Sequence, residues 1–162
     1  FHYSTIIFLS KYLRRFISTN KLLVIGLLVL IVSVQLSELM LSVLRAYGLN
    51  TILGSRGKIS LFNSVSIFLY FNVFVVGVVA KHFINNKLSK DFLYVAICSL
   101  LASILFWILR FQPAFFRFQE LAGFFLLVPI LYILQQSKYH YVYAALFLPY
   151  YAAVGYTAVT LL

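Results

Sequence analysis

The chain has 162 residues, of which 64% are hydrophobic and 10% are charged, and its formal net charge is +10. A soluble fold of this length has a single core, and that core cannot bury so many apolar side chains. The composition therefore favours an integral membrane protein. The positive charge does not indicate a nucleic-acid partner, since the basic residues form short clusters between hydrophobic runs, as they do in membrane proteins.

The hydrophobic runs predict transmembrane helices, because about 20 apolar residues are needed to cross the hydrocarbon and bare peptide groups find no partners in lipid. A short run over 3–17 starts apolar and ends basic. Five full spans follow, at 22–44, 61–80, 92–109, 118–135 and 139–160. The predicted fold is all-α, a polytopic transmembrane helical bundle of five full spans plus one N-terminal partial helix. We expect residues 1–162 to be a single transmembrane domain within a longer polytopic protein, since the chain opens on FHYS without Met.

The basic residues between the spans predict the orientation of the chain. With alternating spans, eight Lys and Arg side chains share one side, in segments 11–21, 81–91 and 136–140. The opposite side collects five, in segments 45–60 and 110–117. This excess predicts that the first set faces the cytoplasm.

The two sides also differ in the kind of basic residue. The outer set consists of Arg45, Arg56, Lys58, Arg110 and Arg117, whereas lysine dominates the inner set. Arginine presents a planar fork that matches phosphate oxygens, and lysine is a hydrated point charge. The outer arginines therefore predict an anionic ligand, with contact to lipid headgroups as the alternative.

Polar residues recur at helical spacing in the outer halves of two neighbouring spans. The first stripe is Gln35, Glu38, Ser42 and Arg45, and the second is Asn63, Ser66 and Tyr70. Spacings of three and four place each stripe on one helical face. Amide, hydroxyl and aromatic groups of this kind bind sugars, so we expect Asn63 and Tyr70 to contact substrate. The alternative is interhelical hydrogen bonding, including a structural pair between Glu38 and Arg45.

The stretch RFQPAFFRFQELAG interrupts two apolar runs with polar residues. Pro113 predicts that the preceding helix stops near Arg110. We expect a tight turn or a short re-entrant dip over 111–116, with the next helix starting at about Arg117. Arg117 and Glu120 lie one turn apart and can pair. Two arginines here favour a bound anion, and an ion pair anchoring a helix end is the alternative.

His2 is the histidine that falls on the same side as the outer arginines. It is a candidate base, although a lone histidine is also commonly structural. The three histidines are dispersed, and the chain holds one cysteine and three carboxylates. The sequence therefore predicts neither a metal site nor another cofactor.

Two segments carry a resemblance to a known family. The opening FHYSTIIFL resembles the HxS segment midway through EpsG/Wzy-type polysaccharide polymerases. The run RFQELAGFFLLVPILYIL, led by Arg117, resembles a late helix of the same family, in which an Arg precedes an apolar stretch ending in a Pro. The resemblance implies that the chain is the C-terminal half of such an O-antigen, capsule or exopolysaccharide polymerase.

The activity implied by the resemblance is the joining of oligosaccharide repeat units carried on undecaprenyl pyrophosphate, at the outer face of the bacterial inner membrane. An acceptor hydroxyl attacks the anomeric carbon of the donor and the lipid pyrophosphate leaves. This metal-independent glycosyl transfer needs cations for the leaving group and a base for the hydroxyl. By position, the first role falls to Arg117 and Arg110, with Arg45 and Arg56 as helpers. His2 matches the base, Glu38 is the runner-up, and Glu120 would orient Arg117.

The expected partners are the undecaprenyl-pyrophosphate-linked oligosaccharide, the lipid bilayer and, as an optional component, a chain-length regulator. Three alternatives remain open: an O-antigen ligase-like glycosyltransferase, a transporter or flippase for the lipid-linked oligosaccharide, and a non-catalytic subunit of a membrane complex. A carrier needs a polar path that continues towards the cytoplasm. The inner half of span 22–44, LLVIGLLVLIV, is apolar, which argues for a one-sided pocket.

Overall fold

The computed structural model describes residues 3–46, 64–108 and 112–160, and helices are the only regular elements in these ranges. In chain order they are α1 (Tyr3–Leu13), α2 (Thr19–Ala46), α4 (Ser64–Phe83), α5 (Lys87–Ile108), α6 (Gln112–Gln136) and α7 (His140–Thr160). The prediction of an all-α fold is confirmed.

Short polar segments precede α2 and α5 and satisfy first-turn amide groups of these helices. The Ser18 hydroxyl accepts a hydrogen bond from the amide of Lys21 at 3.5 Å, at the start of α2. The Asn86 side chain accepts one from the amide of Leu88 at 2.9 Å, at the start of α5. These two residues act as N-caps, which explains why the helices begin where the sequence turns polar.

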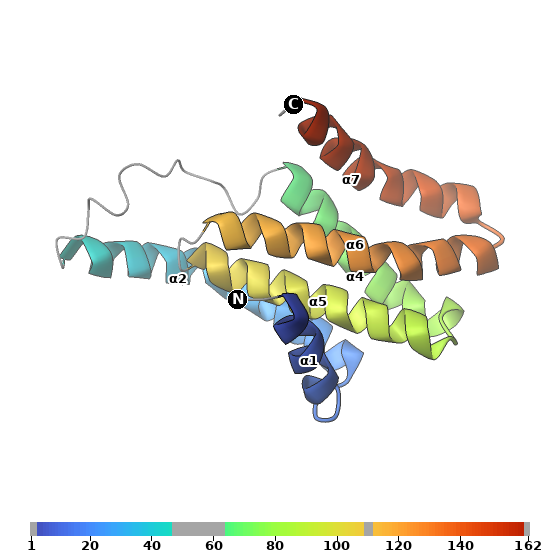
Figure 1. Cartoon of the computed structure of the whole chain (residues 1–162), viewed down its shortest axis with the longest axis horizontal. Helices are drawn as coiled ribbons and strands as arrows, with labels where there is room; N and C mark the ends of the chain where they lie inside the picture. The colour runs from blue at the N-terminus through green and yellow to red at the C-terminus, as the bar shows by residue number, and fades with distance from the viewer. Residues whose placement is uncertain (1–2, 47–63, 109–111, 161–162) are drawn as a thin grey trace.

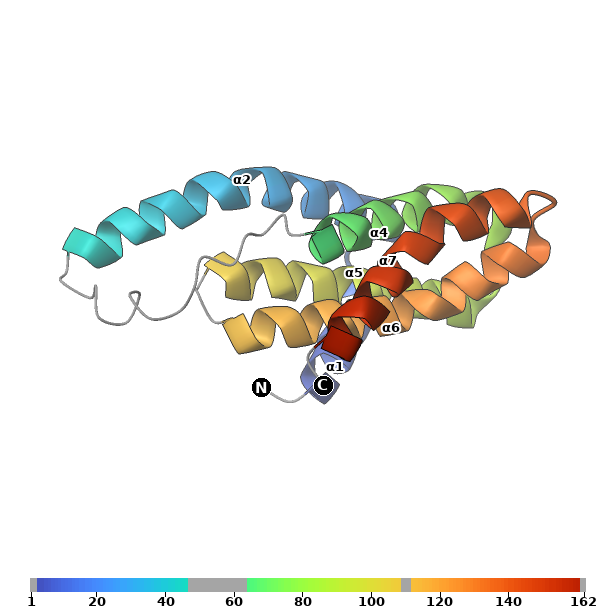
Figure 2. The same cartoon turned by 90° about the horizontal axis from the view of Figure 1, so that it is seen from above.

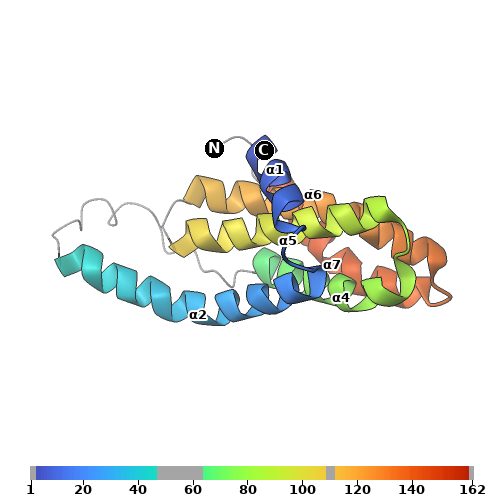
Figure 3. The same cartoon turned by 90° about the horizontal axis from the view of Figure 1, so that it is seen from below.

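The pair α5 and α6 forms the centre of the bundle, and these two helices share the most extensive packing in the molecule. α2 packs on α5, α7 packs on α4 and α6, and α4 contacts α2, α5, α6 and α7. α1 lies across α5 (Figures 1 and 3). The second half of α2 continues beyond the neighbouring helices (Figure 2).

Three helix connections meet at one end of the bundle. The start of α2 and of α5 and the end of α4 line a common hollow that includes Asn20, Ala80 and Lys90. Phe83 of α4 and Tyr143 of α7 bring their rings within 5.9 Å, edge to face. We call this the basic end, because it carries the predicted inner cluster of lysines. The Arg117 end is the opposite one, where α4 and α6 begin and α5 ends (Figure 1).

The bundle exposes apolar side chains and buries polar ones. Phe124 and Leu131 of α6 are 64% and 57% exposed, whereas Gln119 of the same helix is 3% exposed. Other buried polar residues on the long helices are Ser33, Ser66, Asn72, Ser89, Ser99 and Ser103. A water-soluble bundle has the reverse distribution. This arrangement suits helices whose outer faces meet lipid.

The prediction of five full spans is not supported. Within the described residues, α5 over Lys87–Ile108 and α6 over Ala114–Gln136 are long and apolar enough to cross a membrane. Shorter apolar stretches within the described residues are Thr19–Ser33 of α2 and Ser66–Ala80 of α4.

The start of α6 also differs from the prediction. The helix begins at Gln112, so it includes Pro113 in its first turn instead of starting at about Arg117. A proline is well tolerated in that position, because the first amides of a helix have no intrahelical acceptor and the fixed φ of proline suits a helix. The predicted turn over 111–116 is therefore wrong for 112–116.

Candidate functional site

A buried polar cluster joins α4 to α6 near the Arg117 end. The side-chain amide of Gln119 donates a hydrogen bond to the Ser66 hydroxyl at 2.7 Å. The same nitrogen lies 3.5 Å from the Tyr70 hydroxyl. Ser66 and Tyr70 were predicted to share an inward face of their helix, and both turn towards α6. Polar side chains therefore link the two helices at a depth where the surrounding core is apolar.

Aromatic side chains surround this cluster. Phe106 of α5 and Phe118 of α6 stack with ring centroids 5.2 Å apart. Phe115 and Ile104 are buried together, and the partly buried rings of Tyr70 and Trp107 pack against them. The Arg117 end thus combines amide and hydroxyl groups with aromatic rings.

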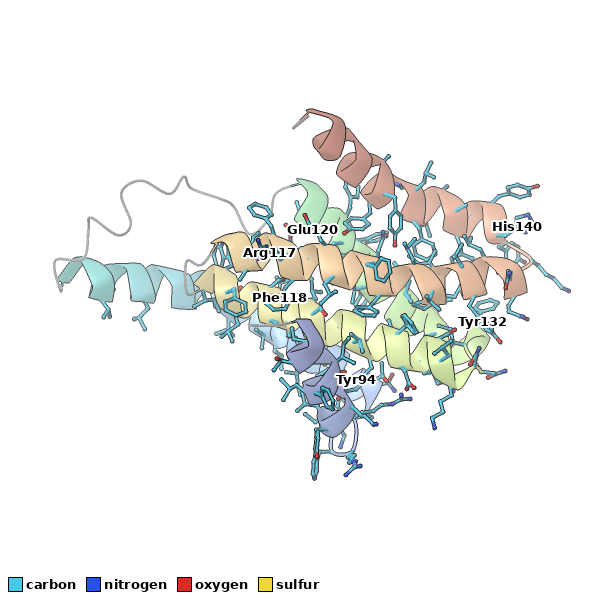
Figure 4. The ribbon with its side chains drawn as sticks, viewed as in Figure 1. Tyr94, Arg117, Phe118, Glu120, Tyr132 and His140 are labelled. Atoms are coloured by element: carbon cyan, nitrogen blue, oxygen red, sulfur yellow. The ribbon has the colours of Figure 1, made fainter. Side chains whose placement is uncertain are left out.

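Arg117 and Glu120 lie on successive turns of α6 at the same end. Both are exposed, and they leave α6 on the side away from α5, whereas Phe118 points towards α5 (Figure 4). Among the described side chains, Arg14 forms an ion pair with Asp91, whereas Arg117 and Glu120 do not pair with each other. The guanidinium of Arg117 is accordingly available to an external anion.

α7 closes the adjacent side of α6 through two tyrosines. The Tyr151 hydroxyl donates a hydrogen bond to the Gly123 carbonyl at 3.2 Å. Tyr150 is buried against Gly123, where a Cβ atom would lie 2.8 Å from its Cζ. α7 therefore packs against α6 three residues beyond Glu120.

The structure does not describe the side chains of the remaining predicted site residues. His2, Arg56, Asn63 and Arg110 lie outside the described residues. Glu38 and Arg45 belong to α2, but their side chains lie outside the description as well. The convergence of several arginines on one anion therefore stays a prediction.

Gln119 was given no role by the sequence reasoning, although it is the central donor of the polar cluster. The sequence nevertheless contains a signal that Gln119 is buried. Buried Phe115 and Ala122 lie four residues before and three residues after Gln119, and this spacing marks one face of a helix. Gln119 thus interrupts an apolar stripe, which indicates a buried amide with a partner on another helix.

Comparison of the chain with protein-family models, with curated proteins and with solved structures gives no match. No group of three or more His, Cys, Asp or Glu side chains gathers within the described ranges. The chemistry available at the Arg117 end is thus that of a guanidinium, a carboxylate, an amide, hydroxyls and aromatic rings.

Proposed function

We propose that the chain is part of a membrane polysaccharide polymerase that joins oligosaccharide units carried on undecaprenyl pyrophosphate. The observation that carries the proposal is the group at the Arg117 end. An exposed arginine and glutamate lie there beside a buried Gln119–Ser66–Tyr70 cluster. Arginine suits the pyrophosphate, and amide, hydroxyl and aromatic groups suit the sugars.

In the proposed reaction, an acceptor hydroxyl forms a bond to the anomeric carbon of the donor. The bond between that carbon and the pyrophosphate oxygen breaks, and the lipid pyrophosphate leaves with the electron pair. Arg117 binds the leaving group and stabilises its growing charge, with Arg110, Arg45 and Arg56 as helpers. A base takes the hydroxyl proton, and His2 and then Glu38 are the proposed candidates.

The proposal includes the multi-pass arrangement. We propose that α2, α4 and α7 also cross the inner membrane, with the residues beyond their apolar cores completing each span. The basic end then lies in the cytoplasm and the Arg117 end at the outer face, in agreement with the distribution of Lys and Arg.

The cavity next to Tyr70 favours a one-sided site over a carrier. The cavity between α2, α4 and α5 has a volume of about 50 Å³, and Tyr70 is the one lining residue with a polar side chain among the residues described there. A cavity of this kind stays dry. It offers no continuation of the polar cluster towards the basic end, which a transport path for a lipid-linked sugar requires.

The test replaces Arg117 in the whole protein, in membranes supplied with the undecaprenyl-pyrophosphate-linked repeat unit. We expect Arg117→Ala to reduce polymer formation about 100-fold or more, as loss of one transition-state donor commonly does. Arg117→Lys keeps the charge but loses the fork, so it should retain intermediate activity. Product length on gels is the readout.

Lys138→Ala is the matched control, because Lys138 is an exposed cation at the basic end. It should leave polymer length unchanged. Wild-type polymer from a normally inserted Arg117→Ala protein would exclude this function for the Arg117 end. Loss of polymer in both variants would point to a general effect of surface charge.

A further inference from the structure

A groove between α1 and α5 at the basic end gathers cations from two helices. Its volume is about 660 Å³, and it is lined by Lys11, Arg14 and Arg15 on one side and by Lys87 and Asp91 on the other. Four cations thus face one carboxylate. This is a strong local excess of positive charge, and it lies at the end opposite Arg117.

The groove is held in shape by contacts across it. Arg14 pairs with Asp91, and the Tyr94 hydroxyl donates a hydrogen bond to the Ile17 carbonyl at 3.1 Å. The guanidinium of Arg15 lies 5.4 Å from the centre of the Tyr12 ring. The pairing of Arg14 with one carboxylate leaves Lys11, Arg15 and Lys87 without a carboxylate partner among the described side chains.

The surface next to these cations is apolar. The exposed side chains on α1 include Ile7, Phe8, Leu9 and Tyr12, and Ile7 and Val95 line the groove itself. α1 ends in basic residues next to these apolar side chains, since Lys11 lies in its last turn. The combination of apolar and basic side chains at a helix end is typical of the level of the lipid headgroups.

We propose that this groove binds the phosphate of an anionic phospholipid from the leaflet that meets the basic end. Lys11, Arg15 and Lys87 contact the phosphate, and Arg14 is positioned by Asp91. The acyl chains run along Ile7 and Val95. A soluble phosphate uses the cations alone, whereas an anionic phospholipid uses both the charge and the apolar wall.

The inference does not depend on the proposed polymerase activity, because it concerns the other end of the molecule. Arg117→Ala should leave lipid binding intact. Failure of the groove to bind lipid would leave the polymerase proposal untouched.

The test is titration of phosphatidylglycerol into the detergent-solubilised whole protein, followed by the rise in its unfolding midpoint. We expect saturable binding of phosphatidylglycerol and none of zwitterionic phosphatidylcholine. Lys11→Gln and Lys87→Gln should each weaken binding about fivefold, the effect of one Lys or Arg near a charged lipid surface. Both side chains are exposed, so the variants should fold normally.

Two controls separate the groove from general attraction. Lys138→Gln removes a cation from the same end outside the groove and should leave the affinity unchanged; an equal loss would overturn the proposal. Glycerol phosphate supplies the anion without acyl chains and should not compete. Competition at the lipid's own concentration would assign the groove to soluble phosphate instead. Equal binding of phosphatidylglycerol and phosphatidylcholine would show that the groove does not select for negative charge, and this result would also overturn the proposal.

Discussion

The amide of Gln119 spans the interface between α6 and α4, where few polar groups are available to replace it. Its nitrogen donates to Ser66 at 2.7 Å, and Ser66 is fully buried. An interhelical hydrogen bond inside a membrane bundle contributes about 0.6 to 2 kcal/mol. The same bond fixes the rotation of α6 that turns Arg117 and Glu120 outward.

Gln119→Met removes the donor and keeps the length of the side chain. We expect it to lower the free energy of unfolding by about 1 kcal/mol, because the Ser66 hydroxyl loses its partner on α6. Gln135→Met is the control, since Gln135 is exposed on the same helix. Thermal unfolding in detergent measures both. Equal stability of Gln119→Met and the wild type would contradict the role given to this bond.

Gly123 of α6 lies in close contact with the Tyr150 side chain of α7. A Cβ atom there would lie 2.8 and 2.9 Å from the Cζ and Cε1 atoms of Tyr150, and the buried ring has little room to move. Gly123→Ala should therefore lower the free energy of unfolding by about 1–3 kcal/mol through overpacking.

Gly26→Ala is the matched control for this overpacking. The nearest atom to its added Cβ is Cδ2 of Leu101 at 3.6 Å, an ordinary contact. Alanine also favours a helix over glycine, so this variant should be as stable as the wild type or more so. A Gly123→Ala protein with an unchanged unfolding midpoint would show that α7 shifts without cost.

The residues of the site were partly predictable. The spacing of Ser66 and Tyr70 predicted their common face correctly, because helical periodicity alone decides it. Gln119 was not predicted, because its charged neighbours Arg117 and Glu120 are the stronger signal in the sequence, whereas both of these turn outward. Their partners depend on which helices pack beside α6, and a single sequence does not contain that information.

At the scale of elements, the apolar runs predicted where helices lie. Helices α2, α5 and α6 begin earlier than the predicted spans, at neighbouring polar residues. The span predicted at 92–109 is α5 over Lys87–Ile108, which starts five residues earlier at an Asn86 cap. The span predicted from 118 is α6, which starts at Gln112. Proline was read as a helix stop, but in a first turn it is compatible with the helix.

The connection between α1 and α2 is attached to α5 by one partly buried hydrogen bond and one more exposed ion pair. Tyr94→Phe removes its hydrogen bond to the Ile17 carbonyl at 3.1 Å. A bond of this kind contributes about 1 kcal/mol, so local opening of residues 14–18 should increase about fivefold. Hydrogen exchange of these amides measures it. Tyr139→Phe is the control, because Tyr139 is 69% exposed.

Asp91→Asn should have a smaller effect on the same amides. The side chains of Arg14 and Asp91 are 34% and 42% exposed, and exposed ion pairs contribute about 0–1 kcal/mol. A larger effect of Asp91→Asn than of Tyr94→Phe would contradict this ranking and would place the main attachment of α1 at the ion pair.

At the scale of the whole molecule, the distribution of side chains argues for lipid around the bundle. Composition predicted this, because 64% hydrophobic residues exceed what one core can bury. The number of full spans was less predictable, since α5 and α6 are the helices that are long and apolar enough to cross a membrane within the described residues.

Because the basic end and the Arg117 end lie at opposite ends of the bundle, the orientation of the chain in the membrane can be tested in intact cells. The chain has one cysteine, Cys98, which is buried, so single cysteines can be added to a Cys98→Ala protein. Phe116→Cys lies at the Arg117 end, and Lys138→Cys lies at the basic end; both positions are exposed.

A membrane-impermeant maleimide should label Phe116→Cys in intact cells and Lys138→Cys only after the membrane is opened. Clusters of Lys and Arg are retained on the cytoplasmic side during insertion. Because α6 is long enough to span the membrane, its other end, which carries Phe116, should then lie outside. Labelling of both positions from outside would place α6 at the surface of the membrane, and the reverse pattern would put Arg117 in the cytoplasm, away from any acceptor on the outer face.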